Sequence, residues 1–293
     1  MAKKEQKLIL VTGATGHQGG AVFRHLRKRN FPVRLLTRNA EKPEVRGLVG
    51  KGVDVVQGNL DNPDSIRRAL EDVQGVYSVQ TLGDSIEAEI RQGIDLAEAS
   101  NRSGVSHLVY SSVGSADRNT GIPHFDSKYR IEEHIRSIGI RYTILRPVFF
   151  MENWLGMRHM LEQGKLALPL TPETRLQMIA VDDIGAFATT AFEHPGHWEK
   201  RAVDIAGDEL SMAELAQAFS RITGKTVAYE QVPWDRFEQQ AGHEMTVMYR
   251  WFQNVGYNVD IAGLRQEHPS PINFDRWLNT TWTTTEARKV AGA

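Results

Sequence analysis

The sequence predicts an α/β protein with a doubly wound parallel sheet and a smaller, mostly helical C-terminal lobe. Short apolar runs alternate with helix-like segments through the first half of the 293-residue chain, and a glycine-spaced loop joins the first run to the first helix. After Pro147 the pattern changes, and aromatic residues and methionines cluster. Buried strands separated by helices favour a parallel sheet with right-handed crossovers, and this length suffices for one large domain with an added lobe.

Six apolar runs are predicted as strands of this sheet. They span residues 8–11, 33–37, 53–57, 76–79, 107–111 and 142–146. Helices are predicted between them from their apolar spacing, with the first beginning at Ala21 and the others spanning residues 64–70, 86–103 and 125–138. Pro63 suits the start of the helix over 64–70, and glycines follow the two longer helices.

The segment after Pro147 predicts a strand over residues 176–180, a helix from 182–185 and a strand over 202–206. Ser211 is predicted as an N-cap with Glu214 at the third helical position. We therefore divide the chain into residues 1–153, to whose sheet residues 175–206 add, and a smaller substrate or partner lobe formed by 154–174 and 207–293. The aromatic residues after Ser211 are interpreted as ordinary core; they are Trp234, Trp251, Phe252, Tyr257, Phe274 and Trp277.

The most informative motif follows the first strand. Glycines recur at every third position in the loop Gly13-Ala14-Thr15-Gly16-His17-Gln18-Gly19. A strand, such a loop and a helix, in this order, hold a dinucleotide pyrophosphate, because glycines let the backbone approach the phosphates and the helix N-terminus offers unpaired N–H groups. The alternative is a glycine-rich turn that only packs a helix on a strand. We predict that residues 1–153 form a Rossmann-type nucleotide-binding domain.

The end of the second strand indicates which dinucleotide is bound. An acidic residue holds the ribose diol there in NAD-binding domains, whereas this chain has Arg38, with Lys42 a turn later. Arg38 would bind a 2′-phosphate as a fork and Lys42 would add a point charge, so the predicted cofactor is NADP(H). Asn59, after the third strand, stands where the adenine is often contacted. The alternative for Arg38 and Lys42 is a solvated surface pair.

Ser111 and Ser112 end the fifth strand, and His124 and Lys128 follow in the next helix, at i and i+4 on one face. This spacing resembles the short-chain dehydrogenase/reductase superfamily, whose ordinary members carry a serine and then Tyr-x-x-x-Lys. The resemblance implies that Lys128 holds the ribose, that Ser112 is the candidate serine, and that His124 replaces the proton-donating tyrosine. Tyr129 cannot replace it, because it is rotated by about 100° from Lys128 on the helix. Proton donation by His124 and a capping or pocket-lining role both stay open.

Five runs together resemble the NmrA-like branch of the atypical short-chain dehydrogenases. They are residues 12–16, 37–39, 124–128, 145–153 and 179–185, and the resemblance covers roughly residues 6–235. It implies a Rossmann domain with a small C-terminal lobe and a preference for NADP(H). Some members of the family act as cofactor-ratio sensors that bind regulatory partners, and others reduce quinones or similar acceptors.

The same resemblance implies a cofactor site. The pyrophosphate loop matches Gly13, Thr15, Gly16, His17, Gln18 and Gly19. The 2′-phosphate side matches Arg38 and Lys42, and the nicotinamide ribose edge matches Gln80, Thr81 and Lys128. The loop beneath the nicotinamide matches Pro147, Phe149, Phe150 and Asn153.

We expect an NADP(H)-binding sensor or regulator with weak or no Tyr–Lys-type turnover, because His124 stands in the tyrosine position beside an intact cofactor site. The alternative is an NADPH-dependent reductase of a small conjugated acceptor such as a quinone, which needs little help from an acid. Phe149, Phe150 and Trp154 would suit such a flat substrate. Nucleotide-sugar epimerase or dehydratase chemistry is a weaker alternative, because those relatives need the tyrosine.

Composition narrows the partners. The 35 basic and 36 acidic residues give no net attraction to nucleic acid or to a membrane, and the absence of cysteine excludes disulfides and thiolate catalysis. The histidines show no metal-ligand spacing. No window approaches the roughly 18 apolar residues of a membrane span, and the first residues lack a secretory signal, so a cytoplasmic protein is expected. The expected partner is a small aromatic or quinone-like molecule; a regulatory protein and a homodimer stay open.

Overall fold

The structure, a computed structural model, describes residues 7–80 and 85–284. The chain divides into two compact units. Unit 1 contains Met1–Arg118, Pro123–Arg146 and Ile184–Asp204, and unit 2 contains Asn119–Ile122, Pro147–Asp183 and Ile205–Ala293. The boundary after Arg146 falls a few residues before the boundary expected from the sequence.

Unit 1 is built on a seven-stranded sheet in the order β10-β6-β5-β4-β1-β2-β3. The strands are β1 (Ile9–Val11), β2 (Val33–Thr37), β3 (Val53–Gln57), β4 (Gly75–Ser78), β5 (His107–Ser111), β6 (Tyr142–Pro147) and β10 (Arg201–Ile205). Strands β1 to β6 pair in parallel, and β1, β4 and β5 are buried along their whole length. Continuous apolar runs are typical of strands covered on both faces. The predicted doubly wound parallel sheet is confirmed.

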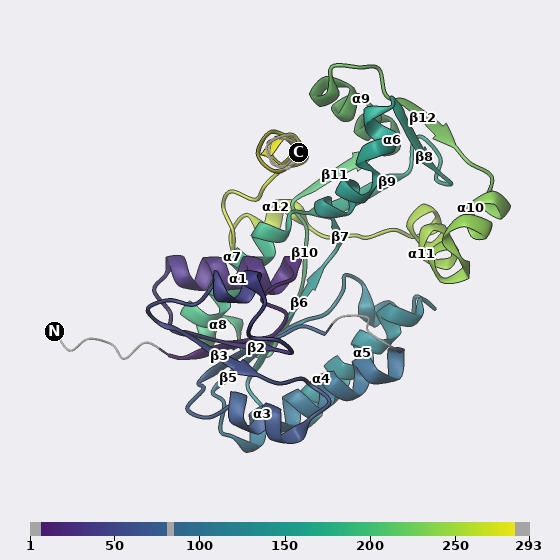
Figure 1. Cartoon of the computed structure of the whole chain (residues 1–293). Coiled ribbons are helices and arrows are strands. Elements are labelled where there is room, and N and C mark those ends of the chain that lie inside the picture. Colours follow the sequence, from purple (N-terminus) through teal and green to yellow (C-terminus); the bar gives the residue numbers. More distant parts are fainter. Residues whose placement is uncertain (1–6, 81–84, 285–293) are drawn as a thin grey trace. The chain divides into compact units, whose positions relative to one another are not determined.

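Helices cover both faces of this sheet (Figure 1). One face carries α3 (Pro63–Ala69), α4 (Ile86–Arg102) and α5 (Pro123–Ser137), and the other carries α1 (His17–Lys28), α7 (Val181–Glu193) and α8 (Pro195–Trp198). Leu10, Leu96 and Ile131 share one buried core cluster on the first face. The short α2 (Pro43–Arg46) and the 3-10 turn η1 (Ala116–Arg118) lie in loops.

Helix α1 begins four residues before its predicted start at Ala21. The prediction placed the start after Gly19 and Gly20, because glycine has a low helix propensity. In the structure Gly16 is the N-cap, and the first turn includes Gly19. A Cβ atom on Gly19 would lie 2.4 Å from the carbonyl oxygens of Thr12 and Gly13, so only glycine lets the helix start this close to the loop.

Unit 2 holds two small sheets. The first, in the order β11-β9-β7, contains β7 (Phe149–Phe150), β9 (Arg175–Ile179) and β11 (Asp208–Ser211), and the second pairs β8 (Lys165–Leu168) with β12 (Ala228–Gln231). Its remaining elements are η2 (Met151–Met157), α6 (Arg158–Glu162), α9 (Met212–Thr223), α10 (Trp234–Ala241), α11 (His243–Asn254), α12 (Ile261–Leu264), α13 (Phe274–Trp277) and the π-helical segment Leu278–Trp282. The predicted capping box of Ser211 and Glu214 opens α9.

The expectation that residues 175–206 add to the parallel sheet is wrong for β9. This strand pairs antiparallel with β11 and parallel with β7, and only β10 from that range joins the large sheet. A short apolar run carries no information about which strand it pairs with. Four of the six aromatic residues interpreted as core are buried, whereas Trp234 and Tyr257 are half-buried. None of the described helices is both long and apolar enough to cross a membrane.

Candidate functional site

The parallel strands of unit 1, among them β1 to β5, end at one edge of its sheet. The chain runs from β1 outward to β2 and β3 and then returns to β4 on the other side of β1. The connections after β1 and β4 therefore leave toward opposite faces, and such a switch point opens a crevice for a ligand. The segments that follow these strands carry Gly13, Arg38, Asn59, Gln80 and Ser112. The candidate site is this edge of unit 1.

The glycine loop is a tight turn fastened to β4. Gly13 has a φ of +63°, and its carbonyl accepts a hydrogen bond from the Gly16 N–H at 2.9 Å. Thr12 donates its hydroxyl to the Val79 carbonyl at 2.9 Å and accepts the Val79 N–H at 2.9 Å. Thr12 was missed in the sequence because its partners are 67 residues away.

The first turn of α1 is open to an anion. It has no side-chain cap and no acidic residue, and Thr15, Gly16 and His17 are exposed. The first N–H groups of a helix have no partner within it and carry a partial positive charge. Because a Cβ atom on Gly19 would collide with the loop backbone, glycine at this position lets α1 begin directly at the loop, where its first N–H groups lie. These residues fit a dinucleotide.

Gln18 turns its side chain toward the sheet. Its Oε1 atom accepts a hydrogen bond from the Ser111 hydroxyl at 2.6 Å and a longer one from the Tyr77 hydroxyl at 3.4 Å. Burial raises the pKa of Tyr77, so this phenol stays a donor. Gln18 therefore ties the start of α1 to β4 and β5, and only its backbone faces the expected pyrophosphate position.

Two basic side chains stand free beyond β2. Arg38 and Lys42 are both exposed, and neither has a hydrogen-bonded or ion-paired partner within residues 7–80 and 85–284. Nearby Arg46, in contrast, pairs with Glu41. A fork-shaped guanidinium and an ammonium without partners form a suitable site for a phosphate.

Asn59 shapes the turn after β3. Its side-chain oxygen accepts the Asp61 N–H at 2.9 Å. Hydrogen bonds from Gln92 and Arg91, at 3.0 and 2.9 Å, hold the Asp61 carboxylate and lower its pKa. Asp61 thereby joins this turn to α4, and Arg38 is close enough to add to the effect.

Gln80 is buried just beyond β4. Its amide nitrogen donates to the Ser78 hydroxyl at 2.9 Å, while its oxygen has no partner among the described residues. A buried acceptor without a partner is uncommon and suits a ligand donor. Thr81, predicted beside it, lies outside the described residues.

Lys128 forms a buried ion pair that the sequence did not reveal. Its Nζ atom lies 2.6 Å from Oε1 of Glu89 on α4, and the Ser127 hydroxyl donates to Oε2 of Glu89 at 2.6 Å. The Glu89 side chain is fully buried, and the Lys128 side chain is 13% exposed. No local pattern identifies such a pair, because its members are 39 residues apart on two helices.

His124 occupies the first turn of α5, one turn before Lys128. Its half-buried ring meets Phe125 edge-on at 4.9 Å, and its carbonyl accepts the Ser127 hydroxyl at 3.2 Å. Tyr129 turns elsewhere, with Arg136 5.8 Å from its ring centre. His124 therefore shares the Lys128 face, as its spacing predicted, and its role as a proton donor stays a prediction.

Ser112 is held by a buried network. Its hydroxyl donates to Glu132, whose carboxylate also receives two hydrogen bonds from Arg146, at 2.9 and 2.7 Å. Asp117 and Arg136 extend the network. Burial would lower the pKa of Arg146, but its bonds to Glu132 and Asp117 outweigh this and raise it. The Ser112 hydroxyl therefore donates its hydrogen bond to Glu132, and a catalytic role for Ser112 stays a prediction.

Unit 2 carries the remaining predicted residues. Pro147 is buried, Asn153 is exposed, and Phe149 and Phe150 are half-buried. Trp154 is fully buried, packs 5.4 Å from the Phe149 ring and donates its Nε1 hydrogen to Met178 Sδ. It belongs to the core of unit 2, so the expectation that Trp154 suits a flat substrate is wrong.

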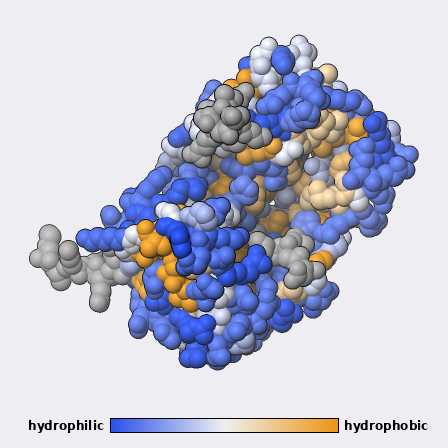
Figure 2. Space-filling model, viewed as in Figure 1, coloured by the Kyte–Doolittle hydropathy of each residue, from blue (hydrophilic) through white to orange (hydrophobic). Residues whose placement is uncertain are grey.

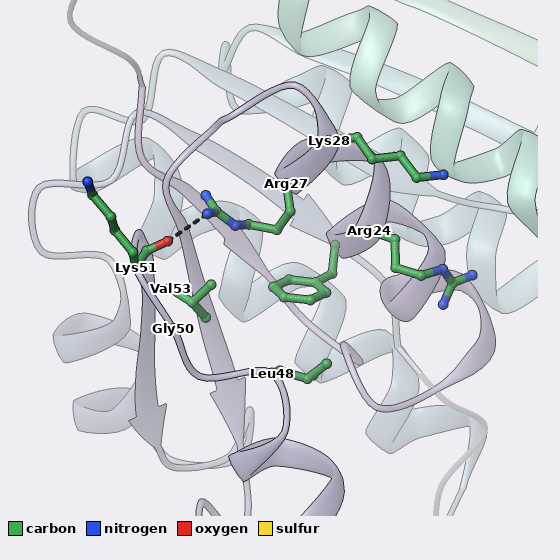
Figure 3. A pocket seen from close by; sticks show the side chains of 8 residues that line it. Arg24, Arg27, Lys28, Leu48, Gly50, Lys51 and Val53 are labelled. Atoms are coloured by element: carbon green, nitrogen blue, oxygen red, sulfur yellow. Dashed lines mark hydrogen bonds between the residues drawn. The ribbon is translucent and has the colours of Figure 1, made fainter.

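A basic depression of about 520 Å³ lies on unit 1 between α1 and β3 (Figure 3). Phe23, Leu48 and Val53 give it apolar walls, and Figure 2 shows hydrophobic residues gathered on this face. Its Arg27 is used structurally, since it donates to the carbonyls of Phe31 and Lys51. None of the dinucleotide residues lines this depression. Across the described ranges, no group of histidines and carboxylates could hold a metal.

Comparison with known proteins shows the family and the fold. The model of the NmrA-like family matches residues 5–278. An NAD(P)H azoreductase from Xenophilus azovorans is 31% identical over 242 residues, which cover 79% of each chain. Triphenylmethane reductase from Citrobacter sp., solved with NADP(H), has a TM-score of 0.81 at 23% identity, covering 93% of this chain and 99% of that one. NmrA, a negative transcriptional regulator solved with NADP, has a TM-score of 0.81 at 21% identity, covering 98% of both chains.

Proposed function

This chain belongs to the NmrA-like family, and from that premise we propose that it binds NADP(H) and reduces electrophilic conjugated acceptors without a proton from the protein. One observation carries the cofactor assignment. The start of α1, which has no side-chain cap and is packed tightly against the loop at Gly19, lies on the same sheet edge as the exposed Arg38. The first feature suits a pyrophosphate and the second a 2′-phosphate. The relatives solved with NADP(H) support this choice.

When bound, NADPH supplies a hydride. The loop N–H groups would hold the pyrophosphate, Arg38 and Lys42 would hold the 2′-phosphate, and Lys128 would hold the nicotinamide ribose. His124 stands in place of the tyrosine acid, and the Ser112 hydroxyl donates its hydrogen bond to Glu132. A quinone or azo compound is already electrophilic, so its reduction would need no proton donor from the protein, and water would supply the proton. The likeness to an NAD(P)H azoreductase supports this acceptor class.

A second candidate is a redox-cofactor sensor that regulates a protein partner. The observation that favours it is that Ser112 and Lys128 are both held by buried carboxylates, Glu132 and Glu89. A site arranged in this way binds the dinucleotide without the usual acid machinery. The likeness to a negative transcriptional regulator supports this candidate.

Titration with NADPH and NADH tests the cofactor assignment. Replacing Arg38 with Ala should weaken NADPH binding about tenfold, or about 1.4 kcal/mol, and leave NADH binding unchanged. Arg102→Ala is the matched control, because it removes the same charge from an exposed position at the far end of α4. Equal losses for both cofactors, or an equal effect of both variants, would contradict the 2′-phosphate assignment.

NADPH consumption separates the two functions. We expect turnover with quinones and azo compounds and little with aldehydes, which need an acid to protonate the developing alkoxide. Lys128→Ala should lower this turnover. Tight NADPH binding with no consumption of any acceptor would instead favour the sensor.

A further inference from the structure

Glu89 is an unusual residue to find inside unit 1. It lies in the first turn of α4, its side chain is fully buried, and both of its oxygens are occupied, by Lys128 and by Ser127. The positive end of the α4 dipole adds to its stabilisation. Moving such a pair out of water is costly, and apolar residues of similar size often stabilise a fold as well or better. Stability alone therefore does not account for the pair.

The ammonium of Lys128 is held but not satisfied. An ammonium has three N–H donors, and Glu89 is its only hydrogen-bonded partner among the described residues. The side chain as a whole is 13% exposed, so solvent reaches only a small part of it. A ligand with hydroxyl acceptors would satisfy the remaining N–H donors.

The other buried polar groups described near Lys128 do not orient its side chain. Glu132, the other buried carboxylate of this region, is engaged by Arg146, Arg136 and Ser112. The Tyr110 hydroxyl is buried without a hydrogen bond among the described residues. Among residues 7–80 and 85–284, Glu89 is the one hydrogen-bonded partner that fixes the direction of the Lys128 side chain.

We propose that Glu89 is the positioning residue of the cofactor site: it holds Lys128 in place and balances its charge, so that the free N–H donors meet the hydroxyls of the nicotinamide ribose. This inference rests on the proposed binding of NADP(H). Without Glu89, Lys128 is a single charge in a poorly solvated place and turns toward water. The ribose then loses a charge-assisted hydrogen bond.

The test compares binding of NADPH with binding of adenosine 2′,5′-bisphosphate, which has the 2′-phosphate but no nicotinamide ribose. Glu89→Gln and Lys128→Met should each weaken NADPH binding about tenfold, as expected for one hydrogen bond to a charged group. The double variant should bind NADPH no more weakly than either single variant. All three should bind the bisphosphate like the wild type.

Two further variants complete the design. Tyr110→Phe removes a hydroxyl from the same interior and should bind both ligands normally. Glu89→Asp keeps the charge with a shorter side chain, so it retains the ion pair if Glu89→Gln is too unstable to study, and it should show a smaller loss for NADPH alone.

Several outcomes would overturn the inference. Unchanged NADPH affinity in Glu89→Gln, losses that add in the double variant, or equal losses for both ligands would each remove the positioning role. If the wild type bound neither ligand, the proposed function would itself be wrong and this inference would be lost with it. Normal bisphosphate binding with no effect of Lys128→Met on NADPH would overturn only the inference.

Discussion

Replacing Gly19 with Ala tests how closely the glycine loop approaches α1. The new Cβ atom would lie 2.4 Å from the carbonyl oxygens of Thr12 and Gly13, so the backbone must retreat by about 0.6 Å to reach even 3.0 Å. Overpacking of this kind costs about 1–3 kcal/mol, whereas the better helix propensity of alanine returns roughly 1 kcal/mol. We expect a net loss of up to about 2 kcal/mol.

The neighbouring Gly20 is a matched control. It lies in the same helical turn, but a Cβ atom there would be 3.2 Å from the Ala14 carbonyl oxygen, so a shift of a few tenths of an ångström relieves it. Gly20→Ala therefore gains the same propensity at a smaller steric cost and should be near neutral. Urea unfolding measures the stability of both variants, and titration with NADPH measures their affinity for the cofactor.

Gly19→Ala should also weaken NADPH binding at least tenfold, because the displaced Gly13 backbone belongs to the loop that holds the pyrophosphate. If Gly19→Ala were as stable as Gly20→Ala and bound NADPH like the wild type, the tight packing of α1 against the glycine loop would be contradicted. The cofactor site would then lose its main support.

Three further predictions concern the framework of the site. Arg146→Leu leaves the buried Glu132 with Arg136 as its remaining cation and should cost about 3 kcal/mol in urea unfolding, whereas Arg146→Leu with Glu132→Leu should cost less. Burial, with smaller contributions from Lys7 and Arg141, lowers the pKa of His107 to about 4. Below pH 6.5, His107 is therefore protonated in the unfolded chain but stays neutral in the folded protein. About 3 kcal/mol of stability, which is fully present above pH 6.5, is lost as the pH falls to 4. Unfolding of His107→Gln should lack this pH dependence, and an unchanged slope would contradict the assignment. Ser211→Ala removes the α9 capping box and should lower stability by roughly 1 kcal/mol in thermal unfolding; an unchanged melting temperature would contradict the capping role.

Much of unit 1 could be predicted because its signals are local. The strands at residues 33–37, 53–57 and 107–111 have the predicted bounds, since short apolar runs between turn residues determine them. The start of α1 was misplaced because packing of Gly19, rather than propensity, decides it. In unit 2 the pairing of β9 was missed, because pairing depends on strands distant in the sequence.

The candidate site divides in the same way. The glycine loop, Arg38 and the shared face of His124 and Lys128 follow from spacing along a strand or a helix. The roles of Glu89, Thr12 and Glu132 do not, because each acts on residues far away in the chain. The hydroxyls of Ser111 and Ser112 look equivalent in the sequence, yet one binds Gln18 and the other Glu132.

The amino-acid sequence by itself determined the parallel α/β architecture, the dinucleotide loop and the family, because periodicity, glycine spacing and short motifs are properties of neighbouring residues. Only the tertiary structure decided which buried carboxylate holds which donor, and where β9 pairs. Those choices depend on burial and on distances of a few ångströms between segments that the order of residues along the chain does not specify.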